Sequence, residues 1–189
     1  MRLERVKNFI TSEECSMLNA WVDEGVAKQW LKNGRNLDLS AYTGRVTTRF
    51  YDRNFTYPNT ALQIANRVAH HCGILNYPSI AKFGQDGIIV SAIFTGGHLH
   101  EHVDEKDKNN NATLRCNILT RAAERGGELY VDNTHIAPDV GELHCYLASE
   151  HSHYVTQVEG ATSRVLWMFG AHVPKEHWDN GLIALGETF

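Results

Sequence analysis

Short β-type runs at close spacing fill the second half of the chain, and this pattern restricts the possible folds more than any other feature. Six such runs, separated by Gly, Asn, Asp and Pro residues, cover 88–95, 112–119, 128–131, 142–148, 153–158 and 163–169. Many short strands at this spacing are typical of a β-sandwich or β-barrel. The sequence therefore predicts a β core over about residues 87–173.

Helical patterns occur only before this core. Thr11 is followed three positions later by Glu14, which is the capping-box pattern and predicts a helix over 12–29. Apolar residues at helical spacing predict a second helix over 59–71. Between them, residues 45–51 are rich in β-branched side chains and are predicted to form a strand. Helices followed by strands indicate a mainly β protein with N-terminal helices.

Length and charge narrow the class of protein. A chain of 189 residues has the usual size of one domain, so we expect a single domain over 1–189 with a helical support over about 1–75. The net charge of −4 and the absence of a Lys/Arg-rich run disfavour nucleic-acid binding. Neither a signal-type N-terminus nor a run of eighteen apolar residues occurs, so we expect a cytoplasmic protein without a membrane span.

The tail of the chain leaves the oligomeric state open. After Pro174 it carries several large apolar residues, among them Trp178 and Ile183. These side chains either fold back on the β core or cover a neighbouring subunit, and the sequence does not distinguish the two arrangements.

The cysteines and one of the histidines are expected to be structural. Cys15, Cys72, Cys116 and Cys145 form no C-x-x-C pair, which argues against a thiolate zinc site and against a disulfide framework. We expect reduced, mostly buried thiols. Eleven histidines are a high number for this length, and we expect His144 to lie on the surface of a strand.

Three residues are candidates for metal ligands. His102 and Asp104 lie two positions apart, so they project to the same side if the backbone is extended. His153, at the start of a later β-type run, can supply a third ligand from another strand. Two histidines and one carboxylate on one face of a metal leave positions open for a co-substrate and dioxygen, as in non-haem iron(II) oxygenases. Hydrolytic zinc sites use the same ligand types, so the three residues alone do not decide.

Other histidines offer alternative ligand sets. His98 and His100 share the parity of His102, and closely spaced histidines are typical of cupin metal sites, although no glutamate occurs at the cupin spacing. His151 competes with His153 because both face the same way on an extended segment. The H-x-V pattern that His153 begins favours His153.

Arg164 makes the site hypothesis more specific. It follows His153 by 11 positions on the next predicted strand, where a buried guanidinium can pair bidentately with the distal carboxylate of 2-oxoglutarate. Zinc hydrolases have no such requirement. Arg115 and Asn117 share one face of the strand predicted over 112–119 and either bind the co-substrate or substrate or satisfy a loop.

These elements occur together in an order that resembles one known family. The segment from about Ile93 to Phe169 is similar to the catalytic core of the prolyl-hydroxylase-like 2-oxoglutarate/iron(II) oxygenases, and residues 9–15 are similar to the family's entry helix. The motifs that carry the resemblance are Gly96-Gly97 before His102-Val103-Asp104, then Gly126-Gly127-Glu128-Leu129, then Pro138-Asp139-Val140-Gly141-Glu142-Leu143, and finally His153-Tyr154-Val155 followed by Gly160 and Arg164.

The resemblance implies both a fold and an activity. The fold is a double-stranded β-helix, a jelly-roll or cupin-like barrel, in which His102, Asp104 and His153 hold catalytic iron(II) and Arg164 holds 2-oxoglutarate. The activity is that of a dioxygenase that uses dioxygen, with ascorbate as an accessory reductant, and releases succinate and carbon dioxide. Because related halogenases have Gly or Ala at the position of Asp104, the resemblance implies a hydroxylase. Its substrate is expected to be a small molecule or a peptide: an amino acid, a peptidyl residue such as a prolyl residue, or a metabolite.

Two positions depart from the family pattern. Many relatives carry a tyrosine where this chain has Ile93 and a serine or threonine where it has Leu166, and those groups usually help to hold 2-oxoglutarate. Arg115 and Asn117 are candidates to replace them. A cupin-type barrel without 2-oxoglutarate and a noncatalytic metal- or 2-oxoglutarate-binding sensor stay as the competing hypotheses.

Overall fold

The computed structural model describes residues 1–28, 31–33, 44–47, 56–80 and 88–183. Three helices are present in these segments: α1 (Ser12–Ala27), α2 (Asn59–His71) and α3 (Lys175–Asp179). The strands are β1 (Glu4–Val6), β2 (Lys32–Asn33), β3 (Arg45–Thr47), β4 (Ile89–Ile93), β5 (Leu99–His102), β6 (Ala112–Arg121), β7 (Arg125–Gly126), β8 (Leu129–Val131), β9 (Thr134–Ile136), β10 (Leu143–Leu147), β11 (His153–Val155), β12 (Val158–Glu159) and β13 (Arg164–Val173).

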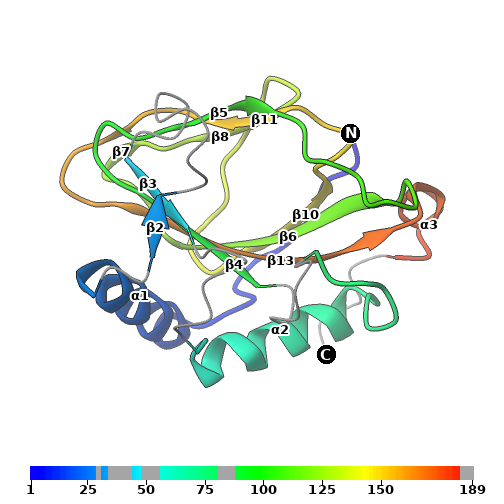
Figure 1. The fold of residues 1–189 in the computed structure, drawn as a ribbon, viewed down its shortest axis with the longest axis horizontal. Coiled ribbons are helices and arrows are strands. Elements are labelled where there is room, and N and C mark those ends of the chain that lie inside the picture. Colours follow the sequence, from blue (N-terminus) through cyan, green and yellow to red (C-terminus); the bar gives the residue numbers. More distant parts are fainter. Residues whose placement is uncertain (29–30, 34–43, 48–55, 81–87, 184–189) are drawn as a thin grey trace.

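Two antiparallel sheets face each other and form the core of the fold. The larger sheet has the strand order β1-β10-β6-β13-β4-β3-β2, and the smaller one has the order β5-β11-β8-β9. Strands β12 and β7 form a separate short pair. Figure 1 shows the smaller sheet above the larger one and the two long helices below it. The prediction of a mainly β double-stranded β-helix with N-terminal helices is confirmed.

The helices cover the outer face of the larger sheet. Helix α1 begins with the capping box read from the sequence, because the Thr11 side chain accepts from the Glu14 amide and the Glu14 carboxylate accepts from the Thr11 amide. Leu18 and Ile64, one from each long helix, are fully buried in the same cluster as Trp167 of β13. This cluster is the main core, and it packs the two long helices against the outer face of the larger sheet.

The predicted element boundaries are close to the observed ones. The second helix, 59–71, is confirmed, and the first ends at Ala27 within the described residues. Of the strand predicted over 45–51, β3 covers Arg45–Thr47, and the remainder lies outside the described residues. The run at 153–158 is two strands, β11 and β12, with different partners.

The C-terminal segment corrects the expectation that helices occur only before the core. Helix α3 follows β13, and Trp178 and Ile183 pack into the main core rather than onto a surface. Figure 1 shows α3 beyond the end of β13, at the edge of the sheet. In the part of the chain that the structure describes, none of the helices is both long and apolar enough to cross a membrane.

The expectation that His144 lies on a strand surface is wrong, because its side chain is fully buried. Strand β10 lies between β1 and β6, and all five of its residues are buried. Its outward side chains pack in the main core and its inward side chains face the smaller sheet. A strand covered on both faces has no exposed position for a polar residue.

Candidate active site

The pairing of β5 with β11 brings two candidate ligands together. His102 and His153 are partners in the antiparallel register, and their ring centroids are 4.3 Å apart. Asp104 lies two residues beyond His102, with its Oδ1 3.5 Å from His102 Nε2 and 4.0 Å from His153 Nε2. The three ligand atoms lie within 4.8 Å of one another, a spacing that suits a single metal ion.

A close turn places β5 for this pairing. Gly96 and Gly97 connect β4 to β5, and Gly97 passes so close to Gly44 that a Cβ on Gly97 would lie 2.6 Å from the Gly44 carbonyl oxygen. The turn is also fixed by two backbone hydrogen bonds of 2.8 Å with Val158. Gly97 is therefore required by the close approach of backbone to backbone, whereas Gly96 is required by its positive φ of 82°.

Backbone carbonyls orient both imidazoles toward the metal position. Nδ1 of His102 donates to the carbonyl oxygen of His100 at 2.8 Å, and Nδ1 of His153 donates to that of His151 at 3.1 Å. A proton fixed on Nδ1 leaves the lone pair on Nε2, which is the form that binds a metal. Burial, followed by the proximity of His102, lowers the pKa of His153 and favours its neutral, metal-binding form.

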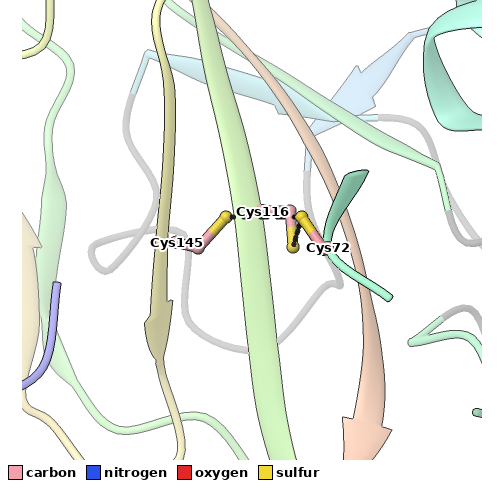
Figure 2. A group of neighbouring side chains, drawn as sticks. All are labelled: Cys72, Cys116 and Cys145. Atoms are coloured by element: carbon pink, nitrogen blue, oxygen red, sulfur yellow. Dashed lines mark hydrogen bonds between the residues drawn. The ribbon is translucent and has the colours of Figure 1, made fainter. Parts of the chain in front are cut away.

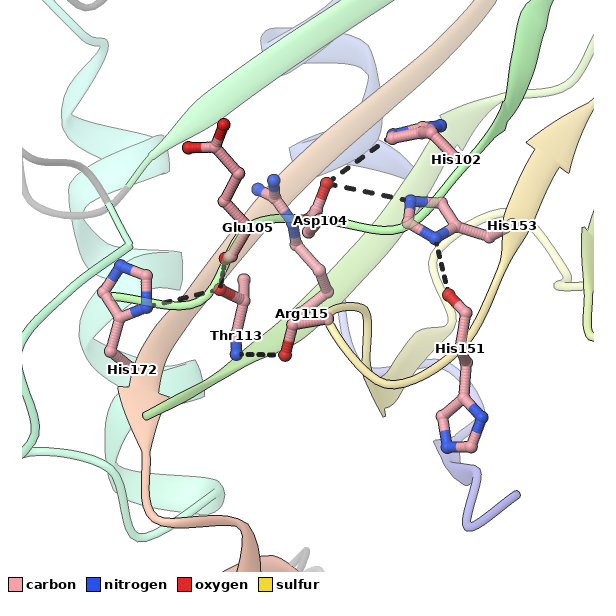
Figure 3. A network of polar contacts seen from close by, with 9 residues as sticks. His102, Asp104, Glu105, Thr113, Arg115, His151, His153 and His172 are labelled. Carbon is pink, nitrogen blue, oxygen red and sulfur yellow. Dashed lines mark hydrogen bonds and ion pairs between the residues drawn. The ribbon is translucent and has the colours of Figure 1, made fainter. Parts of the chain in front are cut away.

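Arg115 fixes the carboxylate ligand. Its Nε donates to Asp104 Oδ2 at 2.7 Å, so that Oδ1 is left toward the histidines. Figure 3 shows Asp104 between the Arg115 guanidinium and the two imidazole rings. Burial alone would raise the pKa of Asp104, but the charge of Arg115 and hydrogen bonds with His102 and Arg115 hold it well below its usual range. The Asp104 carboxylate is therefore ionised at neutral pH.

The pocket extends from the metal ligands across the inner face of the larger sheet. Arg45, Arg115 and Arg164 face it, against the single carboxylate of Asp104. Nε of Arg45 donates to Ser91 Oγ at 2.7 Å. This excess of positive charge favours an anionic occupant. The other lining residues are Ser91, Ile93, Leu99, His102, Asn117, Leu129, Tyr146, His153, Val155, Leu166 and Met168.

Several buried polar atoms of this pocket have no hydrogen-bond partner among the described residues. They are Nη2 of Arg164, Nη1 of Arg115 and Oδ1 of Asn117. Arg164 is only 2% exposed, so its free donor is shielded from bulk water. A buried donor without a partner costs about 1–3 kcal/mol or more when it is charged, and such groups are usually satisfied by a ligand or by ordered water. The donors suit the carboxylates of a dianion such as 2-oxoglutarate, and the triad suits iron(II).

Tyr146 also lines the pocket, although no motif or spacing in the sequence indicates it. It pairs with Arg115 in the register of β10 and β6, so both side chains lie on the inner face. Its ring stands edge-on to that of His153, with centroids 5.6 Å apart. Burial and then the charge of Asp104 raise its pKa, so the hydroxyl keeps its proton and can donate. Because β10 is buried on both faces, its sequence has no alternation of polar and apolar residues that would indicate which side chains point inward.

All six site residues predicted from the sequence lie in this one pocket. His102, Asp104 and His153 form the triad, while Arg115, Asn117 and Arg164 line the same pocket. Arg115 also makes a contact that the sequence did not predict, because it donates to the Asp104 carboxylate.

The competing histidines lie elsewhere. His151 is paired with Asp132 at 2.7 Å, and His98 and His100 contact each other, with 3.3 Å between their Nε2 atoms. None of these rings belongs to the ligand group that the described residues form around Asp104.

Solved structures similar to this chain include prolyl hydroxylases. A Pseudomonas putida prolyl-4-hydroxylase is 14% identical with a TM-score of 0.66, over 90% of this chain and 92% of that one. A viral collagen prolyl hydroxylase from Paramecium bursaria Chlorella virus-1, solved with 2-oxoglutarate, is 16% identical with a TM-score of 0.60, over 92% and 97%. A Trichoplax adhaerens prolyl hydroxylase, bound to a peptide fragment of hypoxia inducible factor, is 13% identical with a TM-score of 0.65, over 90% and 83%.

The comparisons define the fold. No protein-family model matches the sequence, and no curated protein matches it either. The resemblance to the prolyl-hydroxylase-like oxygenases is confirmed at the level of the fold, since each of these neighbours covers nearly the whole chain.

Proposed function

We propose that this protein is an iron(II)- and 2-oxoglutarate-dependent dioxygenase that hydroxylates a C–H bond. One observation carries the proposal: a His–Asp–His triad and a buried guanidinium with a free donor, Arg164, open into the same pocket. The triad alone also suits zinc chemistry, and the buried arginine in the same pocket supplies the carboxylate-binding group that a 2-oxoglutarate oxygenase needs in addition. The shared fold with prolyl hydroxylases supports the same conclusion.

The roles of the residues follow from their positions. His102, Asp104 and His153 would hold iron(II), which supplies the activation of dioxygen and the oxidative decarboxylation of 2-oxoglutarate to succinate and carbon dioxide. Arg164 would bind the distal carboxylate through paired N–H donors, which fixes the orientation of the co-substrate. Arg115 keeps Asp104 ionised and oriented, and thereby preserves the ligand geometry between turnovers.

Tyr146 and Asn117 would replace the polar groups that the family has at the positions of Ile93 and Leu166. Both line the pocket on the inner face, as does Arg164. A protonated phenol and a side-chain amide can each donate to a carboxylate oxygen. The apolar walls contributed by Ile93 and Leu166 would exclude water around these hydrogen bonds and strengthen them.

The substrate is proposed to be a small molecule or a peptide, including a prolyl residue. The side chain of His102 is about one-third exposed, whereas His153 is buried, so the metal position is open on the His102 side. The structural neighbour from Trichoplax adhaerens holds a peptide fragment, which supports a peptide as one candidate.

The test is co-substrate turnover by the iron-loaded protein. Protein reconstituted with iron(II) without oxygen and then exposed to air with 2-oxoglutarate, ascorbate and candidate substrates should form succinate. Asp104→Ala should abolish succinate formation, a decrease on the order of 10³-fold or about 4 kcal/mol in activation free energy. Arg67→Ala, which changes an exposed arginine paired with Glu14, should keep full activity and serves as the matched control. Folded protein that binds 2-oxoglutarate but never forms succinate would identify a sensor instead.

A further inference from the structure

Three of the four cysteines gather at one point on the outer face of the larger sheet. Cys116 of β6 and Cys145 of β10 are direct partners in the antiparallel register. Cys72 ends helix α2 as its C-cap and reaches the same point from the helix layer. Figure 2 shows the three side chains converging from these separate elements. All three are buried, with exposures of 0–1%.

The spacing of the sulfurs matches a three-coordinate metal site. Sγ of Cys72 lies 3.8 Å from that of Cys116 and 4.0 Å from that of Cys145, and all three sulfurs lie within 4.8 Å of one another. An ion at the centre of a planar triangle, with metal–sulfur bonds of about 2.3 Å, requires sulfurs about 4.0 Å apart, which is √3 times the bond length. An ion can therefore enter the triangle with shifts of a few tenths of an ångström.

The ligand set selects the kind of ion. Within the described residues the group contains three sulfurs and no nitrogen or carboxylate ligand. Structural zinc sites are almost always four-coordinate, so a closed set of three thiolates does not complete one. Soft thiolate ligands favour copper(I), which has a filled d shell and accepts three ligands without a preferred geometry of its own.

We propose that Cys72, Cys116 and Cys145 form a three-thiolate site for copper(I) that clamps the end of α2 to the larger sheet. The site lies on the opposite face of the sheet from the His–Asp–His triad, and the proposal does not depend on the proposed oxygenase function. It departs from the expectation drawn from the missing C-x-x-C pair, because the three ligands come from strands and a helix far apart in the sequence.

Binding to this site must release thiol protons. Burial raises the pKa of Cys145, whereas hydrogen bonds from Cys116 and then Cys145 lower the pKa of Cys72. Cys72 is the C-cap of α2, and local opening is easiest at a helix end. Since the ion displaces protons, copper(I) affinity should fall as the pH is lowered.

The test is copper(I) retention by the intact chain under anaerobic conditions, in competition with a copper(I) chelator. Wild-type protein should retain one equivalent and unfold at a higher temperature with copper(I) than without it. Cys15→Ser is the matched control, because Cys15 is also buried but lies on α1 outside the cluster, and it should retain one equivalent. Cys72→Ser and Cys116→Ser should retain less than about one tenth of an equivalent, a change of at least tenfold.

Two further measurements keep the proposal falsifiable. The double variant His102→Ala/His153→Ala should retain copper(I) fully, and loss of copper there would assign it to the histidines and overturn the proposal. X-ray absorption at the copper edge of wild-type protein should show three sulfur ligands at about 2.3 Å, the usual metal–thiolate distance. Nitrogen or oxygen ligands, or no retention by wild-type protein, would identify the cluster as three packed thiols only.

Discussion

The two faces of the larger sheet are built on opposite principles, and strand β13 displays both. Its outward residues Val165, Trp167 and Phe169 are apolar and pack against the helices in the main core. Its inward residues Arg164, Leu166 and Met168 line the pocket, and Arg164 keeps a buried donor without a partner among the described residues. Side chains two residues apart share a face, so one strand serves both surfaces.

The difference shows where stability and function are separated in this fold. The outer face gains its free energy from apolar burial, which needs no ligand. The inner face gathers charges whose burial costs free energy, and the proposed anion and metal would complete their contacts. The sheet can carry these incomplete contacts because the opposite face supplies the stability. Changes on the two faces should therefore have different effects.

The largest change in stability is expected on the outer face. Trp167 is fully buried and lies 5.5 Å from Trp21, centroid to centroid. Trp167→Ala should lower the free energy of unfolding by about 3–5 kcal/mol, because it removes a large core side chain and leaves a cavity. Urea unfolding would measure this, with the exposed Leu182→Ala as a control within about 0.5 kcal/mol of wild type. A loss below about 1 kcal/mol would show that the outer face does not carry the stability.

The inner-face counterpart is Arg164→Ala. This change removes charge-assisted hydrogen bonding to the co-substrate. The loss of one such bond, worth about 1.5–3 kcal/mol, already weakens 2-oxoglutarate binding roughly 10- to 150-fold, so at least this decrease is expected. The free energy of unfolding without ligand should change little or rise, because an incompletely paired buried charge is lost. Calorimetric titration and urea unfolding of the same preparation would measure both quantities. Unchanged affinity with lower stability would make Arg164 a structural residue.

His144 tests the inner face through pH. Burial, followed by the charges of Arg164 and Arg5, lowers its pKa to about 3 from an ordinary 6.5. Between about pH 6.5 and 3, the His144 ring therefore binds a proton in the unfolded chain but stays neutral in the folded chain. The free energy of unfolding consequently falls as the pH is lowered through this window. His144→Leu should reduce the slope of unfolding free energy against pH by about 1.4 kcal/mol per unit in that window. If the curves of unfolding free energy against pH were parallel for wild type and variant, His144 would not be buried as a neutral ring.

Tyr146→Phe should have the smallest effect. It deletes one neutral hydroxyl that we expect to donate to 2-oxoglutarate, worth about 0.5–1.5 kcal/mol, so affinity should fall roughly 2- to 12-fold. Tyr154→Phe is the matched control, because Tyr154 stacks on Tyr130 away from the pocket and should leave affinity unchanged. Equal effects of the two substitutions would remove Tyr146 from the co-substrate site.

Local patterns in the sequence were sufficient for the parts of the fold that local physics determines. The capping box at Thr11 marks the start of α1, and the spacing of two residues at the end of β5 places His102 and Asp104 on one side. The approach of His153 to His102 could be predicted from the chemistry of the two side chains and from the family resemblance. Each of the two histidines begins a short motif, and the motifs occur in the order that the family shows.

Contacts that depend on strand register could not be predicted in this way. Three features depend on contacts between separate elements. They are the Arg115–Asp104 pair, the placement of Tyr146 beside Arg115 and the cysteine cluster. Strand β10 is buried on both faces, so its sequence lacks the alternation that would separate Tyr146 from Cys145. For the same reason the burial of His144 was not visible.

The most direct test of the central claim is an anaerobic titration of 2-oxoglutarate into iron(II)-loaded protein, followed by the visible charge-transfer absorption of the chelate. The pocket predicts a band that saturates at one equivalent per chain, disappears in Asp104→Ala and requires more 2-oxoglutarate in Arg164→Ala. A folded, iron-loaded protein that develops no such band would contradict the assignment of the triad and Arg164 to a single co-substrate site.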